Sequence, residues 1–133
     1  MDLATLTLDD GIKISGVTPQ DQTGAGMLFI ERNEDGISDL FVSAPAASLT
    51  VPISCVLQVS RTGAGIIYVI LGKTTGLNNI NIADFDNTYR ITIIGAVDND
   101  GIGQSLFNAG DIDGDGQRAV SMDHTYFTRP LRK

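Results

Sequence analysis

Short runs of hydrophobic residues, separated by glycines and polar turn residues, follow one another along the chain. The clearest runs lie at residues 12–16, 39–43, 65–72 and 89–95, and most of their apolar residues are β-branched or aromatic. Runs of this length and composition are typical of β-strands. No segment sustains the 3.6-residue period of an amphipathic helix. The pattern predicts an all-β protein.

The sequence also contains an internal repeat. A shift of 79 residues superposes segment 3–24 on segment 82–103, with matching apolar positions and glycines. After one inserted residue, a shift of 80 superposes segment 31–36 on segment 111–116. Self-similarity over this distance indicates repeated supersecondary units that bury their faces against their neighbours.

Composition and charge narrow the class of partner. The chain has 133 residues, 42% of them hydrophobic, which suits one globular unit. Its formal net charge of −7 argues against nucleic acid or an anionic membrane surface as a partner and favours divalent cations. The charge is uneven: residues 1–116 carry 15 acidic and 5 basic side chains, whereas residues 117–133 carry 1 acidic and 4 basic ones.

Targeting and cysteine signals are sparse. The single cysteine, Cys55, excludes an intrachain disulfide and offers no zinc cluster, so we interpret it as a packed apolar residue. The first residues show no signal peptide, and no stretch approaches the ~20 apolar residues of a membrane helix. We therefore do not expect an integral membrane protein.

The strongest chemical signal is a run of alternating carboxylates near the C-terminus. Asp111, Asp113 and Asp115 precede Gly116, and Gln117 stands at the seventh position of this loop. Alternation within a turning chain directs the side chains inward, and such oxygen ligands suit Ca²⁺, which takes 6 to 8 of them. The pattern favours a calcium loop over simple hydrogen-bonded turns.

The upstream copy of this loop offers a second set of oxygens. Glu31, Asn33 and Asp35 occupy its first, third and fifth positions, the Ile37 carbonyl the seventh, and the Asp39 carboxylate the ninth. An EF-hand would require a glutamate at position twelve of each loop, where this chain has valine and methionine. The EF-hand interpretation therefore fails twice, and for this loop hydrogen-bonded turns stay an equal alternative.

Three ordered motifs resemble the FG-GAP repeats of integrin α-subunit propellers and bacterial surface proteins. Residues 102–116 are similar to the family's first strand and its Gly-Asp-x-Asn-Gly-Asp-Gly loop. Residues 39–45, DLFVSAP, resemble the Leu-x-Val-Gly-Ala-Pro step that follows, and residues 63–73 resemble the third strand. Together, the repeats cover about residues 1–121.

The resemblance implies β-propeller blades. One complete four-stranded blade spans about residues 24–95, and its cation loop joins its first two strands. Its strands are expected near residues 24–30, 39–44, 64–71 and 89–95. Parts of two neighbouring blades are expected at about residues 1–16 and 103–121, and residues 122–133 form an atypical basic tail.

Several residues depart from the family pattern. Glu31 replaces the usual first aspartate, and Ala119 replaces the ninth-position aspartate of the downstream loop. Segment 51–61 is an apolar insertion that could pack as an extra strand. These departures predict that each loop has one missing or altered ligand.

The expected function is a calcium-binding recognition or adhesion scaffold, a fragment of a larger propeller. By resemblance, it acts outside the cell or at the cell surface on a protein or surface ligand that the sequence does not identify. One alternative is a truncated repeat product without independent function, which would self-associate through open blade edges. A carboxylate-dependent hydrolase is less favoured, because the carboxylates lie in glycine-rich turns and the lone His124 lies in the tail. We expect no catalytic residues.

Overall fold

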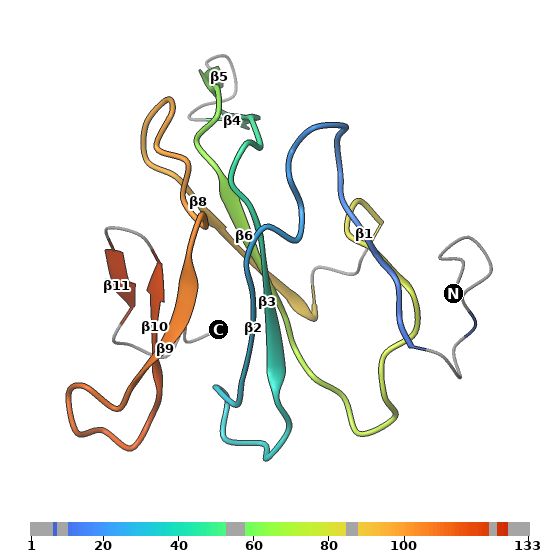
Figure 1. The fold of residues 1–133 in the computed structure, drawn as a ribbon, viewed down its shortest axis with the longest axis vertical. Helices are drawn as coiled ribbons and strands as arrows, with labels where there is room; N and C mark the ends of the chain where they lie inside the picture. The colour runs from blue at the N-terminus through green and yellow to red at the C-terminus, as the bar shows by residue number, and fades with distance from the viewer. Residues whose placement is uncertain (1–6, 8–10, 53–57, 85–87, 123–124, 128–133) are drawn as a thin grey trace.

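The chain folds into β-strands joined by loops. The computed structural model describes residues 7, 11–52, 58–84, 88–122 and 125–127. These residues form eleven strands in four sheets and contain no helix, so the predicted all-β class is confirmed (Figure 1). Within this part of the chain, nothing has the length and apolar character of a membrane-crossing helix. Cys55, His124 and most of the basic tail lie outside the described residues.

The central sheet has four antiparallel strands in the order β2-β3-β6-β8. Each falls inside a strand that the sequence predicted for the complete unit. They are β2 (Met27–Ile30), β3 (Asp39–Ala44), β6 (Ile66–Ile70) and β8 (Arg90–Ile94). Every residue of β3 and β6 is buried, which explains why both appear in the sequence as continuous rather than alternating hydrophobic runs.

A hydrophobic core covers each face of the central sheet, because successive strand residues point to opposite faces. On one face, alternate residues of β3 and β6 meet the segment around β7 (Ile80–Asn81); they include Leu40, Val42, Tyr68, Ile70, Ile80 and Ile82. On the other, the intervening residues meet β10 (Ala119–Met122); they include Phe41, Ile67, Val69, Val120 and Met122. The central sheet is thus packed between two other parts of the chain.

A three-stranded antiparallel sheet, β9-β10-β11, follows the central one. It contains β9 (Leu106–Gly110), β10 and β11 (Thr125–Phe127). Pairing between β9 and β10 corresponds to that between β2 and β3, as the repeat predicts. The third strand, β11, comes from the segment that the sequence marked as an atypical tail.

Glycines allow the two sheets to approach closely. Gly24 and Gly103, superposed by the repeat, have nearly the same positive φ, 94° and 95°. A Cβ atom at Gly103 would lie 2.5 Å from the Ser43 Cβ, so only glycine fits beside β3 there. The equivalence of these two positions supports the repeat at the level of the backbone.

Two smaller pairs complete the structure. The described ends of segment 51–61 belong to two strands, β4 (Leu49–Pro52) and β5 (Gln58–Arg61), which pair antiparallel in a sheet of their own. Near the N-terminus, β1 (Ile14–Ser15) pairs in parallel with β7.

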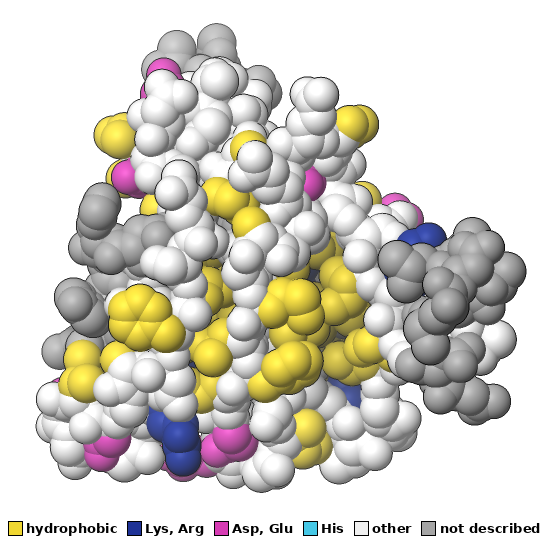
Figure 2. All heavy atoms as spheres, viewed as in Figure 1, with side chains coloured by type: hydrophobic (Ala, Val, Ile, Leu, Met, Phe, Trp, Pro, Cys, Tyr) yellow, Lys and Arg dark blue, Asp and Glu magenta, His cyan; other side chains and the backbone are white. Residues whose placement is uncertain are grey.

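Two neighbouring edge strands, β2 and β9, expose apolar side chains. Met27 and Phe29 on β2 are 53% and 63% exposed, and Phe107 on β9 is 52% exposed. Figure 2 shows hydrophobic side chains gathered over the middle of the face where β2 and β9 lie side by side.

Candidate metal centre

Two acidic loops lie at the same end of neighbouring sheets (Figure 1). The upstream loop, residues 31–39, leads from β2 into β3, and the downstream loop, residues 111–119, leads from β9 into β10. Their backbones turn alike, because the fourth and sixth positions of both have positive φ. These are Glu34 and Gly36 upstream, at 61° and 78°, and Gly114 and Gly116 downstream, at 76° and 85°. The two loops are structural copies.

The downstream loop gathers three carboxylates. Asp111, Asp113 and Asp115 are exposed, and one oxygen from each lies within 4.8 Å of the others. Two oxygens bound to one calcium ion are at most about 5 Å apart, because calcium–oxygen distances are about 2.3–2.6 Å. The predicted ligands are therefore brought together at a separation that a single cation can span.

Hydrogen bonds to the backbone shape this cluster. Asp111 accepts from the N–H groups of Gly114 at 2.8 Å and Gly116 at 3.0 Å, and Asp115 accepts from that of Gln117 at 2.8 Å. These are the turn bonds considered as the alternative to metal binding. They coexist with clustered carboxylates, because a carboxylate has about four acceptor sites and these bonds use only some of them.

The upstream loop repeats one backbone hydrogen bond of the downstream loop but has an asparagine instead of an aspartate at its third position. Asp35 accepts from the Ile37 N–H at 2.8 Å, as Asp115 does from Gln117. Its second oxygen accepts from the Asn33 side-chain amide at 2.8 Å. Asn33 and Asp35 therefore lie together, and part of the ligand capacity of Asp35 is used within the loop.

The ninth position of the upstream loop holds a buried carboxylate with a free oxygen. Asp39 is fully buried, and its Oδ1 accepts from the Gly72 N–H at 2.9 Å. Within the described part of the chain, its Oδ2 has no hydrogen-bond partner, and neither does the buried Oε1 of Glu31. Buried polar atoms are nearly always paired, so these two oxygens require an explanation.

The electrostatic surroundings of Asp39 disfavour its charge. Burial raises the pKa of Asp39, and the nearby carboxylates of Asp35 and Glu31 raise it further, while backbone N–H groups of Gly72 and Arg32 act in the opposite direction. Burial also lowers the pKa of Arg32, which Asp39 partly offsets. The carboxylates of Glu31, Asp35 and Asp39 are therefore close enough to repel one another, and the Arg32 side chain lies near Asp39.

A side-chain bond connects the two loops. The amide nitrogen of Gln117 donates to Glu34 Oε1 at 2.9 Å, across 83 residues of sequence. Gln117 was predicted as a position-seven ligand, and its use of the side chain to contact the other loop was not predicted. Ligation by the backbone carbonyls of Ile37 and Gln117 stays a prediction.

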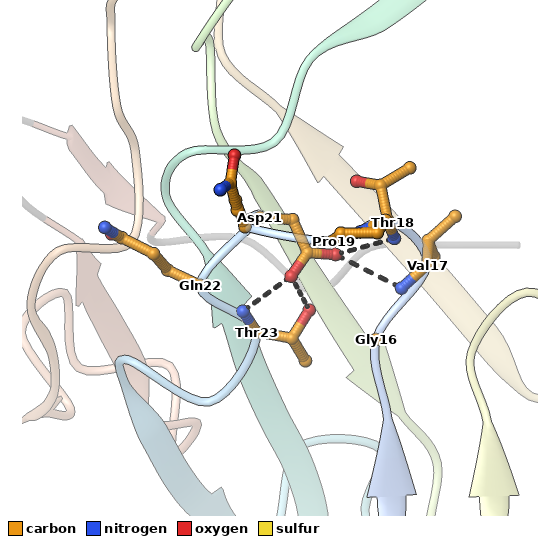
Figure 3. A pocket seen from close by; sticks show the side chains of 8 residues that line it. Gly16, Val17, Thr18, Pro19, Asp21, Gln22 and Thr23 are labelled. Atoms are coloured by element: carbon orange, nitrogen blue, oxygen red, sulfur yellow. Dashed lines mark hydrogen bonds between the residues drawn. The ribbon is translucent and has the colours of Figure 1, made fainter.

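A carboxylate that the sequence analysis missed, Asp21, is the centre of a separate pocket lined by residues 16–23 (Figure 3). Its two oxygens accept from the N–H groups of Val17, Thr18 and Thr23 and from the Thr23 hydroxyl, at 2.8–3.1 Å. Burial would raise the pKa of Asp21, but these bonds outweigh it and lower the pKa. An ionised, saturated carboxylate is unsuited to proton transfer and has a structural role. The repeat could have revealed it, because its counterpart Asp100 accepts from Ala96 N–H at 2.8 Å.

Comparison with known proteins does not extend this picture. A scan against models of protein families gave no match, and a search of curated proteins gave no relative.

Proposed function

We propose that this protein is a calcium-binding module of FG-GAP type, in which residues 24–95 form one β-propeller blade flanked by parts of two others. The observation that carries the proposal is the pair of buried, unpartnered carboxylate oxygens on Glu31 and Asp39. Both belong to the upstream loop, at the positions where the sequence expects ligands. A cation bound in the upstream loop would offer a partner to such an oxygen.

Energetics favour a cation over an empty loop. A buried polar group without a partner costs about 1–3 kcal/mol, and a charged group costs more. Asp39 is fully buried beside two other acidic side chains, and burial already raises its pKa. A divalent cation in the upstream loop would remove this cost at Asp39, although among the described residues only Asp111, Asp113 and Asp115 bring three carboxylate oxygens within 4.8 Å of one another.

The donor set favours calcium among the divalent metals. Both loops offer carboxylate, amide and carbonyl oxygens and contain no histidine or cysteine. Zinc prefers nitrogen and sulfur ligands, and magnesium demands a tight octahedron, whereas calcium accepts flexible all-oxygen sites. The exposure of the downstream carboxylates suits a weak site, in the ~10⁻⁴–10⁻³ M range of extracellular modules.

The module's proposed role is recognition or adhesion outside the cell, by analogy with the resembled family. Support comes from the observed four-stranded sheet, whose strand order and bounds agree with the predicted blade. Cations would fix two neighbouring loops at one end of the sheets and so pre-organise a binding surface for a protein or surface ligand. Binding is favoured over catalysis because the acidic groups lie in turns suited to metal ligation.

The proposal is tested by thermal unfolding with calcium and with chelator. Calcium is expected to raise the melting temperature, since a ligand that binds only the folded state stabilises it by RT ln(1 + [Ca²⁺]/Kd). Asp115→Ala should reduce this increase by removing a clustered carboxylate, whereas Asp84→Ala, an exposed aspartate outside both loops, should leave it intact. An unchanged melting curve in millimolar calcium would overturn the proposal.

A further inference from the structure

Strand β1 has one paired edge and one open edge. Its paired edge faces residues 79–82: Lys13 O accepts from Ile80 N–H at 2.8 Å, and Ser15 O accepts from Ile82 N–H at 3.0 Å. Alternate residues of a strand direct their backbone groups to opposite edges. Ile14 therefore faces the other edge, where β1 has no neighbouring strand among the described residues.

The repeat identifies what this open edge resembles. Ile14 superposes on Ile93 of β8 at the shift of 79 residues. In β8, Tyr89 O accepts from Leu71 N–H at 2.9 Å, and Gly95 N–H donates to Gly65 O at 3.1 Å. The odd-numbered residues of β8, Ile93 included, therefore face β6. The open edge of β1 therefore corresponds to the edge of β8 that pairs with β6 in the central sheet.

Toward the C-terminus, the described residues form a sheet of three strands rather than four. The order β9-β10-β11 corresponds to β2-β3-β6, with antiparallel pairing throughout. In the central sheet β8 lies beyond β6, whereas nothing in the described chain pairs with the far edge of β11. The far edge of β11 therefore matches the open edge of β1.

We propose that β1 of one molecule adds as a fourth strand to the β9-β10-β11 sheet of a second copy of this chain. The contact is head-to-tail, because one copy contributes β1 and the other contributes β11. Each contact converts a three-stranded sheet into a four-stranded one like the central sheet and covers two open strand edges.

Charge favours this orientation over a symmetric one. Segment 1–16 contains three aspartates and one lysine, a net charge of −2, whereas residues 117–133 carry four basic side chains and one acidic one, a net charge of +3. Head-to-tail contact brings opposite charges together, whereas pairing of identical ends would bring like charges together.

The test is the mass of the 133-residue chain in solution, by sedimentation velocity over a concentration series. Wild-type protein is expected to form species of at least two chains that dissociate on dilution. Ile14→Pro removes the N–H on the open edge and none of the bonds to residues 79–82, so it should shift the mass to that of one chain. Ile14→Ala trims the same side chain but keeps the N–H, and it should behave as wild type.

Mixing tests the direction of the contact. An Ile14→Pro chain keeps the β11 edge, so an excess of it should cap wild-type assemblies and lower their mean mass. A wild type of single-chain mass at every concentration would overturn the proposal. So would an Ile14→Pro mass equal to wild type, an Ile14→Ala chain that dissociates as completely as Ile14→Pro, or a mixture whose mass does not fall. Circular dichroism would verify that the proline variant is folded.

Discussion

The upstream and downstream loops follow the same backbone path but place their carboxylates in different surroundings. Downstream, three exposed aspartates lie within reach of one cation, and the ninth position is the apolar Ala119. Upstream, the ninth position is the fully buried Asp39, which has a free oxygen. The repeat therefore determines where the chain turns, whereas individual side chains determine how the carboxylates of each loop are surrounded.

The first and fourth residues of the two acidic loops also differ in their surroundings. Asp111 closes the downstream loop by accepting from two backbone N–H groups, whereas Glu31 upstream has a buried oxygen without a partner. Glu34 adopts a positive φ at the position where the downstream loop has Gly114. The upstream loop thus combines backbone strain with buried carboxylate oxygens that have no hydrogen-bond partner among the described residues, and we expect its folding to depend more on bound metal.

The largest expected effect follows from neutralising the buried carboxylate. Without metal, Asp39→Asn should raise the free energy of unfolding by on the order of 1–2 kcal/mol, because the variant removes a buried negative charge that lies near two other carboxylates. With calcium, the variant should gain less stability than wild type, because a ligand is lost. Chemical denaturation in chelator and in calcium measures both effects. A variant that is less stable than wild type in chelator would contradict this account.

The stability advantage of Asp39→Asn over wild type should depend on pH in a defined direction. Because burial raises the pKa of Asp39, the unfolded chain ionises first as pH increases, and the folded state holds more protons. In chelator, the advantage of Asp39→Asn should be absent below the ordinary aspartate pKa of about 3.9 and complete above the raised one. An advantage that is constant across this window would contradict the assignment.

A reciprocal change in the downstream loop should have an intermediate effect. Ala119→Asp supplies the missing ninth-position carboxylate at a buried position. Calcium affinity of that loop should increase by roughly tenfold, about 1.4 kcal/mol, while stability in chelator falls, because the new charge has no partner. Ala119→Asn is the matched control, since it adds similar bulk without the charge. Calcium titrations of the two variants should therefore differ.

The smallest expected effect concerns backbone strain. Glu34→Gly removes a side chain from a residue with φ of 61° and should relieve roughly 1 kcal/mol of strain, less the loss of its hydrogen bond to Gln117. Glu34→Ala loses the same bond while keeping a Cβ atom, so it should be less stable than Glu34→Gly in urea denaturation. Equal stability of the two variants would show that this position is unstrained.

The sequence predicted the strands of the central sheet and the position of both acidic loops. β-Branched runs, glycine spacing and alternating carboxylates are local signals, and β6, predicted as residues 64–71, was found at Ile66–Ile70. The burial of Asp39 depends on Gly72 from a distant segment, and the bond between Gln117 and Glu34 depends on how the sheets pack. Neither has a local signal, so single-sequence reasoning could not find them.

The most direct test of the central claim is a calorimetric titration of metal-free protein with calcium at constant pH and ionic strength. The account predicts binding at two sites in the wild type. It predicts loss of one of them in Asp39→Asn, and of the other in Asp115→Ala. Absence of saturable binding at millimolar calcium, or a wild-type isotherm that neither substitution changes, would contradict the assignment of these loops as calcium sites.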